Sequence, residues 1–197
     1  PILAYALAMT VGKGRLGPLN LTLIAVSLSG AALFVLRQKT AASPLVRPAA
    51  FRRHGFPASL AANLLVATVI MVTLVVGPFY LSRTLGLGPA PVGFVLAIGP
   101  VVSVLTGVVA GRLVDWFGAS PMVAAGLATM TAGAAGLPVL SALFGLPGYI
   151  LAIVVLTPGY QLFQAANNAA VMTDIPADER GVTAGLLNLS RNLGLIT

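Results

Sequence analysis

The sequence contains no cysteine and few charged residues, and both absences restrict what the chain can be. Without cysteine there is no disulfide framework, thiol nucleophile or thiolate metal site. Charged residues make up only 8% of the 197 residues. Soluble domains typically carry about 25% charged residues. The composition therefore excludes an ordinary soluble domain.

Patterns that carry enzyme chemistry or bind phosphate are also missing. The single histidine, His54, lies in a polar connection, and no Ser/His/Asp or His/Glu constellation or Gly-Lys-Ser/Thr loop occurs. We expect neither an enzyme nor an ATP-driven pump, and no metal or cofactor. The four acidic residues all lie outside the apolar runs: Asp115, Asp174, Asp178 and Glu179. If the protein is proton-coupled, we expect the proton-carrying acid outside this chain.

Long apolar runs dominate what is present. Hydrophobic residues make up 58% of the chain, and the mean hydropathy is +1.00. In hydrocarbon, backbone polar groups must pair internally, so only helices or closed barrels cross the lipid bilayer. Runs near 20 residues favour helices. The sequence predicts an all-α polytopic membrane helix bundle, with five full spans at 18–36, 56–81, 92–109, 122–143 and 149–172.

The two ends carry incomplete spans, residues 1–11 and 181–197. Because the first residue is Pro1 and Thr197 falls inside an apolar run, we expect the chain to be part of a longer protein. Between the spans, Ser120 and Pro121 are typical of a helix start, with serine as the N-cap and proline at the first helical position.

Basic residues give the chain a net charge of +7, but they do not indicate nucleic-acid binding. Apart from Arg191, they lie at span ends and in one connection, without an aromatic-interleaved basic face. The connection 37–53 alone holds five of them. The positive-inside rule therefore places the connections 37–55, 111–120 and 173–180 in the cytoplasm, with the Lys13/Arg15 turn as the exception.

Amide side chains form a stripe in the span 149–172. Gln161, Gln164 and Asn168 stand at i, i+3 and i+7 and so share one helical face. Gln161 would lie about 17 Å from the cytoplasmic end, near mid-bilayer. Two interpretations stay open: hydrogen bonds that hold helices together, or the lining of an aqueous substrate cavity.

A second polar cluster lies in the last span. Asn188, Arg191 and Asn192 are at i, i+3 and i+4, and Arg191 would lie about 16 Å deep. A cation there costs at least about 2.5 kcal/mol, so it should face protein or water. It could bind backbone carbonyls at a helix break, or take part in substrate binding or coupling. Asn63 is a weaker cavity candidate, because a lone Asn in a span often serves only to form hydrogen bonds between helices.

The stretch Gly111-Arg112-Leu113-Val114-Asp115-Trp116-Phe117-Gly118 is a polar hinge between two apolar runs. It resembles the G-x-x-x-D-x-x-G cytoplasmic loop of the major facilitator superfamily, although Trp116 and Ala119 replace the usual basic residues. The resemblance implies that Asp115 latches this loop to a neighbouring helix, while Gly111 and Gly118 allow close approach. Arg112 could substitute for the missing basic partners. The alternative is a solvated acid that anchors topology.

The end of the chain carries a longer pattern. Arg180-Gly181-x-x-x-Gly185-x-x-Asn188-x-x-Arg191-Asn192-x-Gly194 resembles the penultimate span of the fourteen-span drug:proton antiporters of that superfamily. Ser43-Pro44-Leu45 with Phe51-Arg52-Arg53 is similar to the stretch before their second bundle. The resemblance implies an inserted span pair at 1–37, a basic loop at 38–55 and a carboxy-terminal transporter bundle at 56–197.

The resemblance also implies a function. Antiporters of this branch export drug-like small molecules against proton influx by alternating access, with an amino-terminal bundle of the same protein as partner, in the plasma (inner) membrane. The spans 56–81, 149–172 and the last one would then face the cavity. Two alternatives remain open: a facilitator-type carrier of a nutrient or metabolite, and a membrane subunit that transports nothing.

Overall fold

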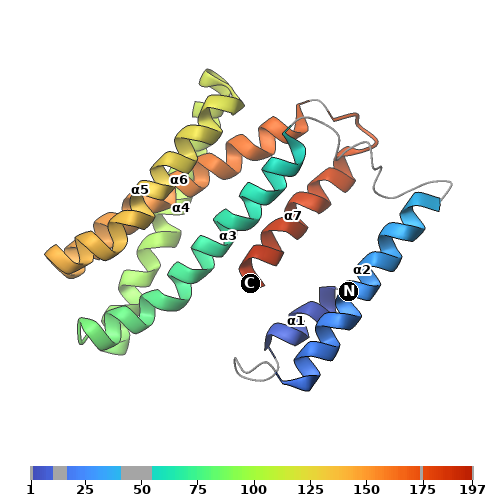
Figure 1. Cartoon of the computed structure of the whole chain (residues 1–197). Coiled ribbons are helices and arrows are strands. Elements are labelled where there is room, and N and C mark those ends of the chain that lie inside the picture. Colours follow the sequence, from blue (N-terminus) through green and yellow to red (C-terminus); the bar gives the residue numbers. More distant parts are fainter. Residues whose placement is uncertain (1, 11–16, 41–54, 174, 197) are drawn as a thin grey trace.

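A computed structural model describes residues 2–10, 17–40, 55–173 and 175–196 (Figure 1). Within these ranges all regular structure is helical. The helices are α1 (Ile2–Thr10), α2 (Pro18–Thr40), α3 (Phe56–Phe79), the π-helical turn η2 (Tyr80–Thr84), α4 (Pro89–Phe117), α5 (Ala119–Phe144), α6 (Leu146–Met172) and α7 (Arg180–Ile196). Most of the basic loop 38–55, the Lys13/Arg15 turn and Asp174 fall outside the described residues.

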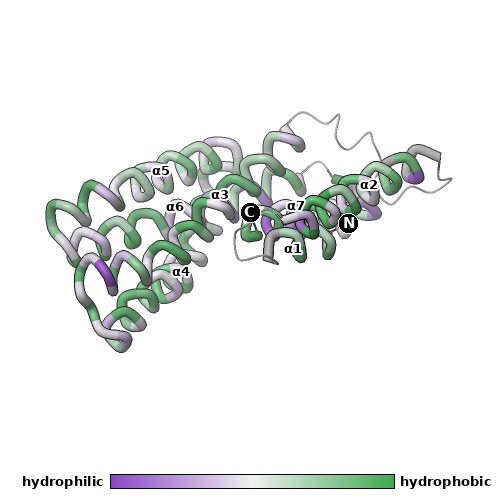
Figure 2. Tube along the Cα trace, turned by 60° about the horizontal axis from the view of Figure 1, so that its bottom comes forward, coloured by the Kyte–Doolittle hydropathy of each residue, from purple (hydrophilic) through white to green (hydrophobic). Residues whose placement is uncertain are grey.

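The helices have the length and composition that a membrane requires. Among the described residues, four continuous helical segments are long and apolar enough to cross it: Phe56–Thr84, Pro89–Phe117, Ala119–Phe144 and Leu146–Met172. The helix α2 adds the shorter apolar stretch Pro18–Phe34. Figure 2 shows hydrophobic and near-neutral residues along most of α3, α4, α5 and α6. The prediction of an all-α membrane bundle is confirmed.

The helix α6 lies at the centre of the arrangement. The helix α5 packs along α6, α4 packs against α6 as well, and α7 packs along α3. The helices α1 and α2 form a hairpin that stands beside this group in Figure 1. The start of α3, the α4–α5 junction and the α6–α7 connection lie toward the same end of the bundle, as three connections on one side of a membrane would.

Glycines explain the close contact between α5 and α6. A Cβ added at Gly133 would lie 2.5 Å from the backbone nitrogen of Leu156, and one at Gly159 would collide with the backbone of Met130. Small residues let membrane helices approach until their backbones touch, which increases van der Waals contact. These two helices therefore depend on having no side chain at either position.

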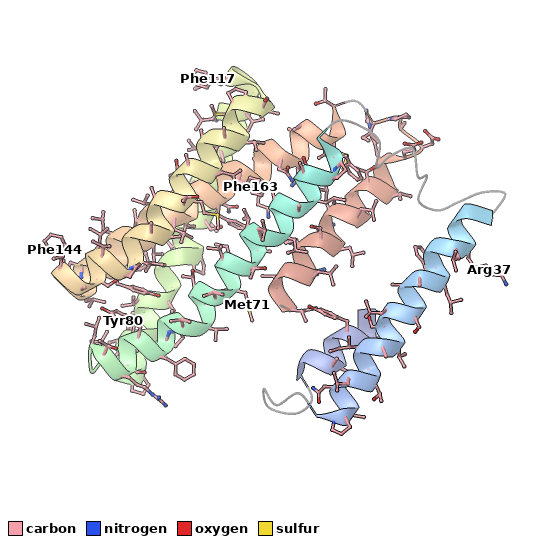
Figure 3. All side chains as sticks on the ribbon, in the orientation of Figure 1. Arg37, Met71, Tyr80, Phe117, Phe144 and Phe163 are labelled. Carbon is pink, nitrogen blue, oxygen red and sulfur yellow. The ribbon has the colours of Figure 1, made fainter. Side chains whose placement is uncertain are left out.

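A cluster of buried side chains fills the centre of the bundle. Phe163 of α6 is 0% exposed and packs with Val66, Met130 and Leu156, from α3, α5 and α6 (Figure 3). A second cluster lies near the start of α6, where the rings of Tyr80 and Tyr149 stack with 6.0 Å between their centroids. The core thus joins α3 to the α5–α6 pair.

The prediction that Gly111–Gly118 forms a loop is wrong. The helix α4 continues through Phe117, so Arg112 and Asp115 lie in its last turns. The break occurs at Gly118 alone, where φ is 85° and ψ is 158°, a conformation almost restricted to glycine. Nothing before Gly118 opposes a helix, because the flanking Leu113, Val114 and Phe117 are apolar and a single Asp does not break one.

Two further helix boundaries differ from the prediction. Gly118, not Ser120, is the N-cap of α5, and no side chain caps that helix. The connection left between the predicted spans 122–143 and 149–172 is reduced to Gly145, which has a φ of 61°, and α6 begins at Leu146. In both places one glycine with positive φ reverses the chain, so the adjoining residues can stay helical.

Candidate functional site

The side chain of Asn63 lies where α3, α6 and α7 meet. It is buried, and its Nδ2 donates a hydrogen bond of 2.8 Å to the carbonyl oxygen of Leu187 in α7. Its Oδ1 accepts a hydrogen bond of 3.2 Å from Nε2 of Gln164 in α6. Both ends of the amide are therefore used in contacts between helices, which satisfies a polar group that would otherwise be costly to bury.

The two predicted glutamines of α6 contact different helices. Gln164 is half-buried and reaches α3 through Asn63, and it also donates to the Tyr160 hydroxyl at 3.3 Å. Gln161 is half-buried and donates to Ser103 of α4, to its hydroxyl and to its carbonyl at 3.1 Å. The stripe thus spreads over the α3 and α4 sides of α6. Sequence reasoning missed Ser103 and Tyr160, for which it offered no periodic signal.

At the end of α6 the exposed and buried amides are neighbours. Asn168, which completes the predicted stripe, is exposed. Asn167 is 1% exposed, and its Nδ2 has no hydrogen-bond partner among the described residues. The i, i+3, i+7 rule selected Asn168 because it measures only the angle around the helix, and says nothing of which side other helices cover. The two asparagines have opposite surroundings.

The helix α7 is fastened to α3 by small and hydroxyl-bearing residues. The Ser190 hydroxyl donates to the carbonyl of Leu60, and the Thr68 hydroxyl donates to the carbonyl of Gly194 at 3.1 Å. A Cβ at Gly194 would collide with the carbonyl oxygen of Leu64. Sequence reasoning singled out neither Ser190 nor this use of Thr68, although Ser190 and Gly194 are spaced i, i+4.

The predicted polar cluster of α7 lies next to the side of the helix that packs against α3. Asn188 and Asn192 are exposed, and Arg191 is half-buried. The Nε of Arg191 is covered and has no hydrogen-bond partner among the described residues. No break occurs in α7 at this point, since the helix runs from Arg180 to Ile196. The guanidinium therefore does not bind carbonyls freed by a broken helix.

The residues of the predicted conformational motif lie together at the α4–α5 junction. Arg112 and Asp115 are exposed, and neither forms a hydrogen bond or ion pair with any other residue that the structure describes. A carboxylate in the last helical turn is unfavourably placed against the dipole of its own helix. Asp115 is thus available to bind another group. Gly111 has open space where a Cβ would lie.

Two cavities lie between the helices. A cavity of about 600 Å³ separates α3 from α5 and is bordered by Val72, Leu137, Ser141 and Tyr149, among others. One of about 220 Å³ lies between α4, α5 and α6, near Thr106 and Pro158. None of the predicted cavity residues lines either one. The polar contacts instead follow the surfaces of α6 and α7.

Comparison with known proteins gives one family over the whole chain. The family model described as the Major Facilitator Superfamily matches residues 1–197. The uncharacterized transporter YebQ of Escherichia coli (strain K12) is 29% identical over 196 residues, which are 98% of this chain and 43% of YebQ.

Two other curated relatives have stated functions. The riboflavin transporter RibZ of Clostridioides difficile (strain 630) is 32% identical over 116 residues, 59% of this chain and 25% of RibZ. The multidrug efflux pump LfrA of Mycolicibacterium smegmatis is 26% identical over 172 residues, 87% of this chain and 34% of LfrA. The chain spans less than half the length of these relatives.

Proposed function

The chain belongs to the major facilitator superfamily, whose members are transporters and not enzymes, and we propose that its full-length protein exports drug-like small molecules across the plasma membrane. Export would proceed by alternating access, in which two bundles rock around a site near mid-bilayer. The similarity to a multidrug efflux pump over 87% of the chain supports this choice of substrate class.

The observation that carries the proposal is the contrast between the exposed sides of α7 and α4. On α7 the exposed residues include Asn188 and Asn192, whereas Val104 and Leu105 of α4 are 77% and 69% exposed. Valine and leucine suit lipid tails, but amides at that depth require water, a polar ligand or another polar side chain. This contrast supports a water-filled cavity beside α7.

The remaining candidates would act in two ways. Asn168, exposed on α6, would face the same space as Asn188 and Asn192. Asn63, Gln161 and Gln164 would hold α6 against α3 and α4 while the bundle moves as one body, and could exchange these bonds for substrate. The hydrogen bonds from Gln164 to Asn63 and from Gln161 to Ser103 support the role of holding these helices together.

Protons would drive the export. Of the described acids, Asp115 lies in the last turn of α4, and Asp178 and Glu179 lie just before α7, so none is in the middle of a span. Intramembrane carboxylates commonly carry the coupling proton. We therefore assign that role to the rest of the full-length protein, and to Asp115 the role of a conformational latch on the cytoplasmic side, with Gly111, Arg112 and Gly118.

An efflux assay tests the proposal. The full-length protein is expressed in a bacterial strain that lacks its own major drug pumps, and growth inhibition is measured for amphipathic antimicrobial compounds of differing charge. We expect resistance to at least one compound, lost with Arg191→Ala or when a protonophore collapses the proton gradient. The exposed Arg83→Gln is the matched charge control. Unchanged inhibition for every compound would contradict export.

A nutrient carrier is the second candidate, and the similarity to a riboflavin transporter favours it. Its test is uptake of radiolabelled riboflavin by cells that cannot synthesise the vitamin, with and without the full-length protein. Uptake that persists without a proton gradient, together with no drug resistance, would favour the carrier. The absence of any flux in both assays would instead indicate a subunit that transports nothing.

A further inference from the structure

The exposed side of α7 forms a continuous strip of glycines and amides. We call it the α7 polar face, and its members are Gly181, Gly185, Asn188 and Asn192. A Cβ added at either glycine would meet nothing within 4 Å. Because lipid-facing strips are apolar, this face is suited to a polar ligand and has room for one.

Arg191 lies at the edge of the α7 polar face. It stands about 16 Å along the helix from Arg180, which is near the middle of a bilayer. Its Nε is buried and has no partner among the described residues. A buried donor without an acceptor is unfavourable, because it has lost its hydrogen bonds to water and gained none in return. An acceptor for this group is therefore absent from the described part of the chain.

Contacts on both sides of Arg191 hold it in place. Ser190, the residue before it, donates its hydroxyl to the carbonyl of Leu60. Gly194, three residues later, accepts a hydrogen bond from Thr68 at 3.1 Å. Rotating α7 about its axis would break both bonds. The position of the cation is thus fixed by the fold.

No carboxylate of the described chain can reach this guanidinium. Glu179 precedes α7 and is about 18 Å away along the axis, and Asp178 is farther. Asp115 is exposed at the end of α4. A guanidinium has five N–H donors and no acceptor, in a planar arrangement that matches two oxygens of a carboxylate or phosphate. The amide nitrogens of Asn188 and Asn192 add further donors beside it.

We propose that Arg191 and the α7 polar face bind a carboxylate or phosphate group of the transported compound, an inference that rests on the proposed function. It narrows the substrate class to amphipathic anions, with an apolar body and an oxyanion head. An amphipathic cation of the same size, with the same apolar body, would be repelled by the guanidinium. A carboxylate elsewhere in the full-length protein offers the same chemistry, and the experiment separates these two sources.

The test uses four compounds that share one apolar chain and differ in the head group. Octanoate, octyl phosphate, octylamine and 1-octanol are titrated calorimetrically against the full-length protein in nanodiscs, with empty nanodiscs subtracted. We expect saturable binding of octanoate and octyl phosphate only. Arg191→Gln should weaken it about tenfold, as loss of a charged hydrogen-bond partner does. Arg191→Lys should be intermediate, and Arg83→Gln should match the wild type.

Other outcomes overturn the proposal. Octanoate binding that Arg191→Gln leaves intact, or tighter binding of octylamine, would refute an oxyanion site. If octanoate fails to bind while the ligand-free Arg191→Gln protein melts at a lower temperature, Arg191 is paired with a carboxylate of the protein, and the assignment to substrate fails. Flux into proteoliposomes is measured separately. Octanoate binding without flux of any compound would overturn only the proposed function.

Discussion

The side-chain nitrogen of Gln164 donates a hydrogen bond to the side-chain oxygen of Asn63, with 3.2 Å between the two atoms. The other end of the Asn63 amide continues to the carbonyl of Leu187 at 2.8 Å. One asparagine thus connects α3, α6 and α7, the three helices that carry the predicted cavity residues. A movement of any one of them along its axis would break at least one of these two hydrogen bonds.

Replacing Asn63 should therefore loosen this junction. Asn63→Leu removes the hydrogen bonds that join α3 to the Leu187 carbonyl of α7 and to the Gln164 amide of α6, and we expect a loss of stability of about 1 kcal/mol. The melting temperature of the full-length protein is the measurement. Thr73→Val is the control, since within the described part of the chain the Thr73 hydroxyl bonds only to Val69 of its own helix, at 2.9 Å. Equal melting temperatures for the two variants would contradict the role of Asn63.

The contact between α5 and α6 should not tolerate a methyl group. A Cβ at Gly133 would lie 2.5 Å from the backbone nitrogen of Leu156, so Gly133→Ala must push the helices apart. We expect it to destabilise the protein by about 1–3 kcal/mol, as overpacking does. Gly93→Ala on α4 meets open space and should be neutral or stabilising. Equal thermal stability would show that the helices are not in backbone contact.

Two glycines of α7 offer a matched pair on one helix. A Cβ at Gly194 would collide with the carbonyl oxygen of Leu64, whereas one at Gly185 meets nothing within 4 Å. Gly194→Ala should lower the melting temperature of the full-length protein, and Gly185→Ala should not. The reverse order would mean that α7 packs on α3 through its other side.

The α4–α5 junction should affect transport more than stability. Asp115 is exposed and has no partner among the described residues, so Asp115→Asn should leave the melting temperature unchanged. If Asp115 latches one conformation, the variant loses a charged hydrogen bond and flux should fall about tenfold. Asp115→Glu keeps the charge and should restore part of the flux. Full activity of Asp115→Asn would leave this residue as a solvated acid only.

Water access to α7 can be mapped with single cysteines, because this chain has none of its own. In full-length protein freed of any other cysteines, Asn188→Cys and Asn192→Cys should react with a membrane-impermeant thiol reagent. Val104→Cys, on the exposed apolar side of α4, should react only with a lipid-soluble one. Unreactive positions 188 and 192 would mean that another helix covers the α7 polar face, and the cavity would be refuted.

The sequence alone determined the kind of the long spans, although it predicted five full ones and four of the described helical segments are long and apolar enough to cross a membrane. Backbone groups in hydrocarbon must bond to one another, so apolar runs near 20 residues had to be helices. It also identified the family through the Gly111–Gly118 stretch and the pattern from Arg180 to Gly194. It misplaced the helix ends around Gly118 and Gly145, because a single glycine of positive φ can replace an entire loop.

Only the tertiary structure decided which polar groups meet. The helices α3 to α6 carry apolar residues on all sides, so periodicity does not reveal which side faces protein. Backbone approach at Gly133 and Gly159 set the rotation of α6, and that rotation sent Gln161 to Ser103 and Gln164 to Asn63. In a membrane, the contacts between helix backbones determine which side of a helix is buried against its neighbours. Hydropathy along the chain indicates only that a span exists.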